Sequence, residues 1–250
     1  MVLAEFLTSY NIRCNRTIKT MRKQYGFTLI EIAIVLVIVG LLLGGVLKGH
    51  ELIAGARVRN LISQHDGIKA AYLGFQDRFR AFPGDYPAAN AAANIPNATF
   101  GGNGDGQILN AGGNNEQTIA WTHLSGAGFL NGSYTITGAA DPVGDGNTPK
   151  NPYGTYLQLV WDLNFAGATG AKHNLKTGNQ IPAEILAEID RKIDDGNSLQ
   201  GSFRFSQYTN ASPTGLPAPA AAHSAGVCAS TTGLWFATQS EADCGGANLF

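Results

Sequence analysis

The first third of the chain divides into stretches of contrasting polarity. Residues 27–47 carry no charge apart from Glu31, and a basic leader precedes them. The basic residues of this leader are Arg13, Arg16, Lys19, Arg22 and Lys23. As an α-helix, the 21 residues from 27 to 47 would be about 31 Å long, which is enough to cross the hydrocarbon core of a membrane. The basic flank predicts that the leader stays in the cytoplasm.

Beyond the apolar stretch, hydrophobic residues recur at steps of three and four. They are Val58, Leu61, Ile68, Tyr72, Phe75, Phe79 and Phe82. This spacing predicts an amphipathic helix whose aromatic stripe faces a core. His65 occupies a gap in the stripe, and we expect it to be a hydrogen-bonded border residue rather than a catalytic base. Because Pro83 disfavours helical geometry in the residue before it, one long helix is predicted from Phe27 to about Arg80, ending by Phe82.

The remaining residues, 83–250, predict a globular α+β head. Residues 83–115 form a connection rich in Gly, Asn and Ala. Helices are predicted at residues 116–124 and 182–193, and strands at residues 153–161, 202–208 and 233–238. The expected architecture is a set of short antiparallel strands packed on the aromatic stripe of the long helix. Residues 27–50 are then a transmembrane helix, and residues 51–82 are the amphipathic half of the same helix.

Glu31 is out of place in its apolar surroundings. A carboxylate within a membrane segment costs about 2.5–3.5 kcal/mol at the helix centre, and such groups usually have a partner. A cut between Gly26 and Phe27 would create an α-amino group within about one helical turn, and the amine of a neighbouring subunit could neutralise the same carboxylate. These positions therefore predict a self-associating membrane helix whose stagger depends on one charge pair.

The run Gly26-Phe27-Thr28-Leu29-Ile30-Glu31, followed by an apolar helix, resembles the processing site of type IV prepilins and type II secretion pseudopilins. The resemblance implies that a prepilin peptidase cuts after Gly26, removes residues 1–26 and methylates Phe27. It also implies that Glu31 guides assembly with other pilin or pseudopilin subunits and with inner-membrane assembly machinery. The motif and its helix cover about a quarter of the chain.

Two other interpretations of the N-terminus are weaker. An ordinary transmembrane anchor would not need Gly26 and would tolerate Glu31 poorly. A secretory signal peptide could end at Ala54-Gly55-Ala56, but 56 residues exceed the usual length of about 15–30. Within the leader, Met21 opens a short basic segment of its own, which favours translation from Met21 and would make residues 1–20 an artefact of start-site assignment.

The charge balance changes when the leader is removed. The mature chain of 224 residues has 12 Lys and Arg against 17 Asp and Glu, a formal net charge of −5. This weakly acidic chain has no electrostatic footprint for nucleic acid. Its length suits one anchor helix and one head domain.

Cys14 belongs to the leader, so the mature chain keeps two cysteines, Cys228 and Cys244. The anchor places them outside the cytoplasm, where an even count favours a disulfide. Closing this loop would contribute about 3 kcal/mol through chain entropy. Two free cysteines in a core are the alternative. A metal site is disfavoured because there is no Cys-x-x-Cys and only His223 lies nearby in the sequence.

Two acidic segments are candidates for calcium. Asn103, Asp105 and the following glycine fit the third, fifth and sixth positions of an EF-hand loop, but glycines replace its first and last ligands. A plain turn is therefore the favoured interpretation there. Asp190, Asp194 and Asp195 form the second candidate, with a solvated helix end as the favoured alternative. Otherwise we expect no cofactor.

Motifs for catalysis are lacking. There is no Gly-x-Ser-x-Gly and no His-Glu-x-x-His, and the pair His223-Ser224, which could be arranged with Asp243, lies in an Ala/Pro-rich linker. We therefore expect a structural protein and not an enzyme. The leading hypothesis is a type IV pilin-like subunit, made as a precursor in the bacterial inner membrane with a periplasmic head, and assembled into a pilus.

Two variants of this hypothesis remain open. One is a pseudopilin of a type II secretion system, which would form a periplasmic pseudopilus. The other is a minor pilin at the filament tip with an adhesive or DNA-uptake role, for which residues 83–115 and the Gly/Pro/Ala-rich residues 210–226 could serve.

Overall fold

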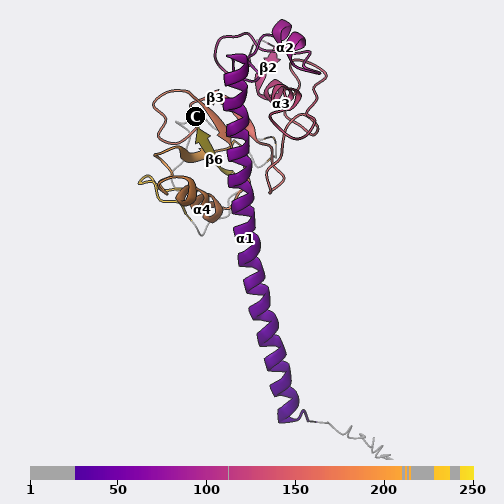
Figure 1. The fold of residues 1–250 in the computed structure, drawn as a ribbon. Helices are drawn as coiled ribbons and strands as arrows, with labels where there is room; N and C mark the ends of the chain where they lie inside the picture. Colours follow the sequence, from indigo (N-terminus) through magenta and orange to yellow (C-terminus); the bar gives the residue numbers. More distant parts are fainter. Residues whose placement is uncertain (1–25, 112, 210–211, 213, 215–227, 237–242) are drawn as a thin grey trace, which may run out of the picture. The chain divides into compact units, whose positions relative to one another are not determined.

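The computed structural model describes residues 26–250 except 112, 210–211, 213, 215–227 and 237–242 (Figure 1). The chain divides into two compact units, residues 1–48 and residues 49–250. The longest helix, α1 (Leu29–Phe79), contains residues of both units. The predicted α+β class is confirmed, since this long helix is combined with a small antiparallel sheet.

In the first unit, α1 begins at Leu29 and continues without a break through the apolar stretch. Its large hydrophobic side chains are exposed, from Leu29 at 90 % to Val39 at 44 %. The helix is long and apolar enough to cross a membrane. Because exposed apolar surface of this extent is unfavourable in water, the segment requires lipid or other apolar helices around it.

The second unit contains a four-stranded sheet with the order β3-β4-β6-β5, in which all neighbours are antiparallel. Its strands are β3 (Gln158–Asp162), β4 (Lys172–Lys176), β5 (Phe203–Gln207) and β6 (Cys244–Leu249). β5 lies within a strand predicted from the sequence, and β3 overlaps a predicted strand that ends at residue 161, whereas β4 and β6 were not predicted. The prediction of a strand at residues 233–238 was wrong for the part that the structure describes, where Trp235 forms only an isolated bridge with Ala229.

Among the described residues, three short helices accompany the sheet. They are α2 (Ala88–Asn94), α3 (Glu116–Gly126) and α4 (Ala183–Ile193). α3 and α4 confirm the two predicted helices. The segment 83–115 was predicted as a connection, but it contains α2 and a small antiparallel pair of strands. These strands are β1 (Asn110–Ala111) and β2 (Asn114–Asn115).

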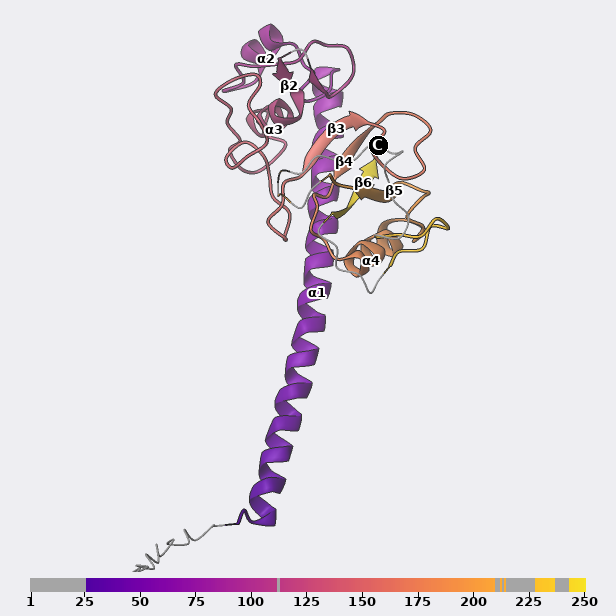
Figure 2. The same cartoon turned by 180° about the vertical axis from the view of Figure 1, so that it is seen from behind.

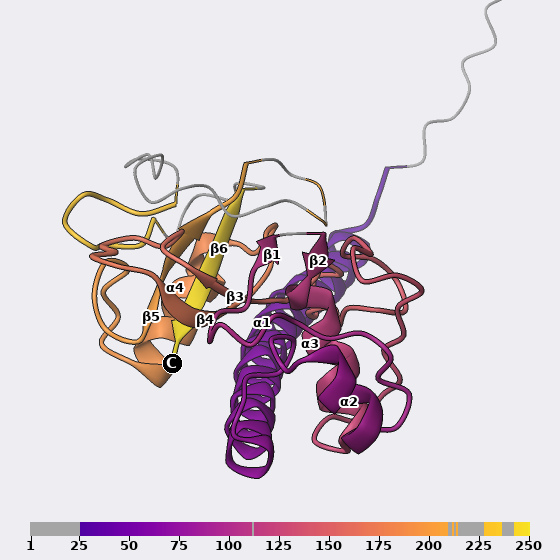
Figure 3. The same ribbon diagram turned by 90° about the horizontal axis from the view of Figure 1, so that it is seen from above.

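Within the second unit, α2, α3 and β2 lie on one side of α1, and the four-stranded sheet and α4 lie on the other (Figure 2 and Figure 3). Two clusters of hydrophobic residues lie along α1. Ile68, Tyr72 and Phe75 pack with residues of α2, α3 and β3. Val58 and Leu61 pack with residues of α4 and β5 and with both cysteines of the C-terminal loop. The predicted aromatic stripe is therefore a core stripe.

Three details of α1 differ from the sequence prediction. The helix begins at Leu29 and not at the predicted Phe27. The helix ends at Phe79, three residues before the predicted limit, because Arg80 adopts a left-handed conformation with φ 55°. Arg80 still donates its backbone N–H to the carbonyl of Gln76. The prediction for His65 was wrong: its side chain is buried, and neither ring nitrogen has a hydrogen-bond partner.

The structure contains a disulfide between Cys228 and Cys244, with Cα atoms 5.9 Å apart. Cys244 is the first residue of β6, and both cysteines are fully buried in the cluster with Val58 and Leu61. The bond therefore links the chain at Cys228 covalently to strand β6 of the sheet.

Replacing both cysteines with alanine is expected to destabilise the protein by about 3 kcal/mol, because the unfolded chain regains the entropy of an open loop. For a chain of this size, the melting temperature should fall by about 6–12 °C. Thermal melts of the full-length protein in detergent can measure this change, with Cys14→Ser as the matched control. Equal melting temperatures for the double variant and the wild type would contradict the role given to the bond.

Candidate functional site

The start of α1 is capped by three reciprocal hydrogen bonds between Thr28 and Glu31. The carboxylate oxygen Oε2 of Glu31 accepts the backbone N–H of Thr28 at 2.7 Å and its hydroxyl at 2.8 Å. In return, the Thr28 hydroxyl oxygen accepts the backbone N–H of Glu31 at 3.3 Å. This arrangement is a capping box, with threonine at the N-cap and glutamate at the third helical position. Glu31 therefore has a local structural role in addition to the predicted one.

Gly26 and Phe27 lie immediately before this cap and outside the helix. Phe27 is 82 % exposed. A Cβ atom added to Gly26 would meet no other heavy atom within 4 Å. The peptide bond between the two residues is therefore in a non-helical, exposed segment, which is the condition that a peptidase requires. The leader residues 1–25, with the predicted start at Met21, lie outside the described residues.

The acidic loop around Asn103 and Asp105 is organised by two carboxylates from elsewhere in the chain. Asp85 accepts the backbone N–H groups of Gly104, Asp105 and Gly106 at 2.7–3.1 Å. Glu116, the first residue of α3, accepts the N–H groups of Asn103 and Leu109 at 3.1 and 2.9 Å. Burial raises the pKa of both carboxyls, and their hydrogen bonds to the backbone oppose this effect.

The side chains of Asn103 and Asp105 are themselves exposed and bonded to each other. Backbone N–H groups thus surround the carboxylates of this loop, where an EF-hand would have a cation. His123 of α3 supports the same region, since its Nδ1 accepts the N–H of Gly84 at 3.0 Å and its Nε2 lies 2.9 Å from the carbonyl oxygen of Phe100. These hydrogen bonds therefore hold the loop in place.

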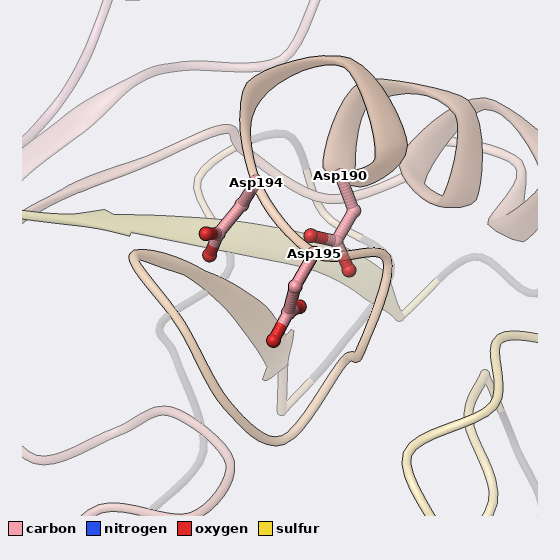
Figure 4. A group of neighbouring side chains, drawn as sticks. All are labelled: Asp190, Asp194 and Asp195. Carbon is pink, nitrogen blue, oxygen red and sulfur yellow. The ribbon is translucent and has the colours of Figure 1, made fainter.

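The second acidic candidate is brought together at the C-terminal end of α4. One carboxylate oxygen from each of Asp190, Asp194 and Asp195 lies within 4.8 Å of the others (Figure 4). Asp190 is fully buried, and its Oδ2 accepts the indole N–H of Trp235 at 2.7 Å. Burial raises the pKa of Asp190 to about 6; the Trp235 hydrogen bond opposes the rise, and the neighbouring acidic groups add to it.

Three residues that position these sites were not found from the sequence. Thr28 had a readable signal, because Thr-x-x-Glu before an apolar run is the pattern of a capping box. Asp85 and Trp235 had none, because each acts on residues at least 19 positions away. His223 and Ser224, which the sequence analysis considered together with Asp243 as a catalytic triad, lie outside the described residues.

Comparison with known proteins supports the N-terminal site. Residues 21–47 match the family described as the prokaryotic N-terminal methylation motif. This motif is the signature of type IV pilins and pseudopilins, and it supports a precursor of pilin or pseudopilin type. It spans the capping box, the segment before it and the apolar half of α1. No curated protein and no solved structure matched the chain.

Proposed function

We propose that the chain is the precursor of a type IV pilin-like structural subunit that assembles into a pilus or pilus-like filament. A prepilin peptidase cuts between Gly26 and Phe27 and methylates the new terminus. The observation that carries this proposal is the methylation motif at residues 21–47, placed on a helix whose apolar side chains are exposed.

The precursor is held in the inner membrane by the apolar half of α1, with its basic leader in the cytoplasm and its head in the periplasm. During assembly, the helices leave the bilayer for an equally apolar filament core. The Phe27 amine of one subunit then approaches Glu31 of its neighbour. Because both hydrogen bonds from Thr28 end on Oε2, the amine approaches through Oε1, and the capping box is kept.

Processing is expected to fail when Gly26 is replaced with valine. A Cβ at this position meets no other atom within 4 Å, so the change affects recognition by the peptidase and not the folding of the chain. The full-length precursor would be expressed with and without a prepilin peptidase, and its N-terminus would be determined by mass spectrometry. Wild-type protein should begin with N-methylated Phe27, and Gly26→Val should keep its leader. A mature N-terminus at any other residue would overturn the proposal.

A pseudopilin of a type II secretion system is the second candidate. The disulfide loop from Cys228 to Cys244 favours a pilus, because such a loop resembles type IV pilins more than pseudopilins, whereas the acidic loops favour a pseudopilin. Deleting the gene distinguishes the two: loss of surface fibres supports the pilus, and loss of exoprotein export supports the pseudopilus. If bulk fibres persist while adhesion or DNA uptake is lost, the subunit is a minor pilin at the tip.

A further inference from the structure

A lysine amine is buried beneath the connection between β3 and β4. The side chain of Lys176 in β4 has no solvent exposure, and its Nζ lies 5.4 Å from the centre of the Phe165 ring. This ring is itself buried and packs with Ala247 and Leu249 of β6. Burial lowers the pKa of the amine from 10.5 to about 8. Part of the amine is therefore neutral near pH 7.5, and a neutral amine is a nucleophile.

The carboxyl group of Asp162 in β3 lies next to this amine, with Oδ1 3.1 Å from Nζ. In the register of β3 and β4, the residue opposite Asp162 is Lys172, which is exposed. Lys176 lies four positions farther along β4 and therefore on the same face of the sheet, so that its side chain extends back along the strand to the carboxylate. The contact thus differs from the usual pairing of opposite charges directly across two strands.

Two further donors converge on the same oxygen. Oδ1 of Asp162 accepts the side-chain N–H of Asn174 at 2.8 Å and the backbone N–H of Asn164 at 3.2 Å. Donors at this position stabilise the negative charge that develops on the oxygen when a nucleophile attacks the carbon. The carbonyl oxygen of Asn164 accepts an N–H of Lys176 at 2.7 Å and orients the amine. A nucleophile, an electrophilic carbon and an oxyanion hole are therefore assembled at one place.

We propose that Lys176 and Asp162 form an isopeptide bond that joins β4 to β3 within the chain. Transfer of one proton inside the buried pair gives a neutral amine and a neutral carboxyl group, which removes two costly buried charges. Nζ then attacks Cγ of Asp162, the bond between Cγ and Oδ2 breaks, and Oδ2 leaves as water with the two protons that the ammonium loses. An ammonium and a carboxylate become an amide and water, so the reaction needs no oxidant and no co-reactant.

The surroundings suit the product as well as the reactants. The N–H of the new amide donates to the carbonyl of Asn164, as the amine did. The amide oxygen, formerly Oδ1, keeps the donors from Asn174 and Asn164. The side chain of Asp162 is 13 % exposed, whereas that of Lys176 is fully buried, so the released water has an exit on the side of the carboxyl group. The amide is thus hydrogen-bonded as soon as it forms.

The bond would close the connection between β3 and β4 covalently. The disulfide at Cys244 acts on β6, which is the other neighbour of β4 in the sheet. Cross-links of this kind reduce the conformational entropy of the unfolded chain, so the two together would make the sheet resistant to unfolding. This role does not depend on which filament the subunit forms.

The test is mass spectrometry of the full-length protein, purified in detergent, reduced and digested with trypsin. Trypsin cuts after Lys172 but does not cut after an acylated Lys176, so the bond joins peptide 151–172 to peptide 173–191. Most of the wild-type protein should give this joined product, lighter than the sum of the two peptides by about 18 Da, the mass of water. Complete cleavage after Lys176 with no joined product would overturn the proposal.

The same digest distinguishes the two groups that the amine could attack. If Nζ attacked the side-chain amide of Asn174 instead, ammonia would leave, and peptide 173–191 would be unjoined and lighter by about 17 Da. That result would overturn the assignment to Asp162. The measurement on the wild type needs no substitution, so it decides the question even where a variant fails to fold.

Variants identify the reacting groups. Lys176→Arg keeps the positive charge but removes the nucleophile and should abolish the joined product. Lys172→Arg, the matched control on the same strand, keeps the trypsin site and should give as much joined product as the wild type. Asn174→Ala removes one donor to Oδ1 and should slow the reaction by about a hundredfold, measured in samples taken at intervals after a pulse of synthesis. Joined product in Lys176→Arg, or its loss in Lys172→Arg, would contradict the bond to Lys176, and an unchanged rate in Asn174→Ala would contradict the oxyanion hole.

Discussion

Replacing Glu31 with glutamine is expected to lower the yield of assembled filament at least tenfold while leaving cleavage after Gly26 unchanged. Glutamine keeps the capping box, because its side-chain oxygen can accept the Thr28 N–H as the carboxylate does. The start of α1 is then preserved, and only the negative charge is lost. In the proposed filament, that charge meets the Phe27 amine of a neighbour, so its loss leaves an unpaired ammonium in apolar surroundings, at a cost of several kcal/mol per subunit.

The matched variant is Thr28→Ala, which removes the cap and keeps the charge. Loss of an N-cap costs about 0.5–2 kcal/mol of helix stability, so Thr28→Ala should retain most of the filament yield. Sheared filaments and the cleaved membrane fraction would be quantified for both variants. A normal yield from Glu31→Gln would show that Glu31 acts through the helix cap and not through a charge pair.

The helices of this protein could be predicted because their hydrophobic residues are periodic. The residues of α1 from Val58 to Phe79 and those of α4 have the spacing of a buried helix face, and the structure buries that face. The aromatic strand β5 was predictable for the same reason, since Phe203 and Phe205 alternate with polar residues. The local pattern of apolar and polar residues was sufficient to predict an element wherever one of its faces is apolar and the other polar.

The strands β4 and β6 lack that signal for two physical reasons. β4 contains Lys176, whose ammonium is fully buried but lies 3.1 Å from a carboxylate oxygen of Asp162 and 2.7 Å from the carbonyl oxygen of Asn164. A lysine predicts an exposed position unless its partners are known. β6 contains two glycines that are required by close packing: a Cβ at Gly246 would lie 2.3 Å from the ring of Phe203. Isolated glycines in a strand indicate such an approach only after the neighbour is identified.

The N-terminal site could be predicted more completely than the acidic sites. Gly26, Phe27, Thr28 and Glu31 are consecutive or one turn apart, so local spacing contains their whole geometry. The cluster at α4 depends instead on long-range contacts: Trp235, which binds Asp190, is 45 residues away. The sequence indicated that the aspartates share a helix end, but not that Asp190 is buried with an oxygen left unpaired.

Lowering the pH from 7.5 to 5 is expected to lower the melting temperature by about 10 °C. His65, His123 and His173 are buried, and burial lowers the pKa of each from 6.5 to about 4. Below pH 6.5 the unfolded chain takes up protons that the folded chain refuses, so stability falls as the pH decreases toward 4. Each histidine contributes up to about 3 kcal/mol over this range and about 2 kcal/mol at pH 5.

Acidic groups oppose this loss only in part. The raised pKa of Asp190, about 6, means that the folded state binds its proton first, which stabilises the fold as the pH falls. This gain is about 1 kcal/mol at pH 5, and Asp85 and Glu116 act in the same direction. The three histidines together outweigh this gain, so the free energy of unfolding falls by about 4 kcal/mol in total. In a chain of this size, each kcal/mol lowers the melting temperature by roughly 2–4 °C.

His65→Leu identifies the cause. Neither ring nitrogen of His65 has a hydrogen-bond partner, so leucine removes the proton acceptor without breaking a bond, and the variant should lose less stability between pH 7.5 and 5 than the wild type. His123 cannot serve this purpose, because its Nδ1 accepts the backbone N–H of Gly84, and replacing it with leucine would break that hydrogen bond. Melts would be recorded with chelator present, and the exposed His50, changed to glutamine, is the control. A pH dependence in His65→Leu as steep as that of the wild type would show that the buried imidazole does not resist protonation.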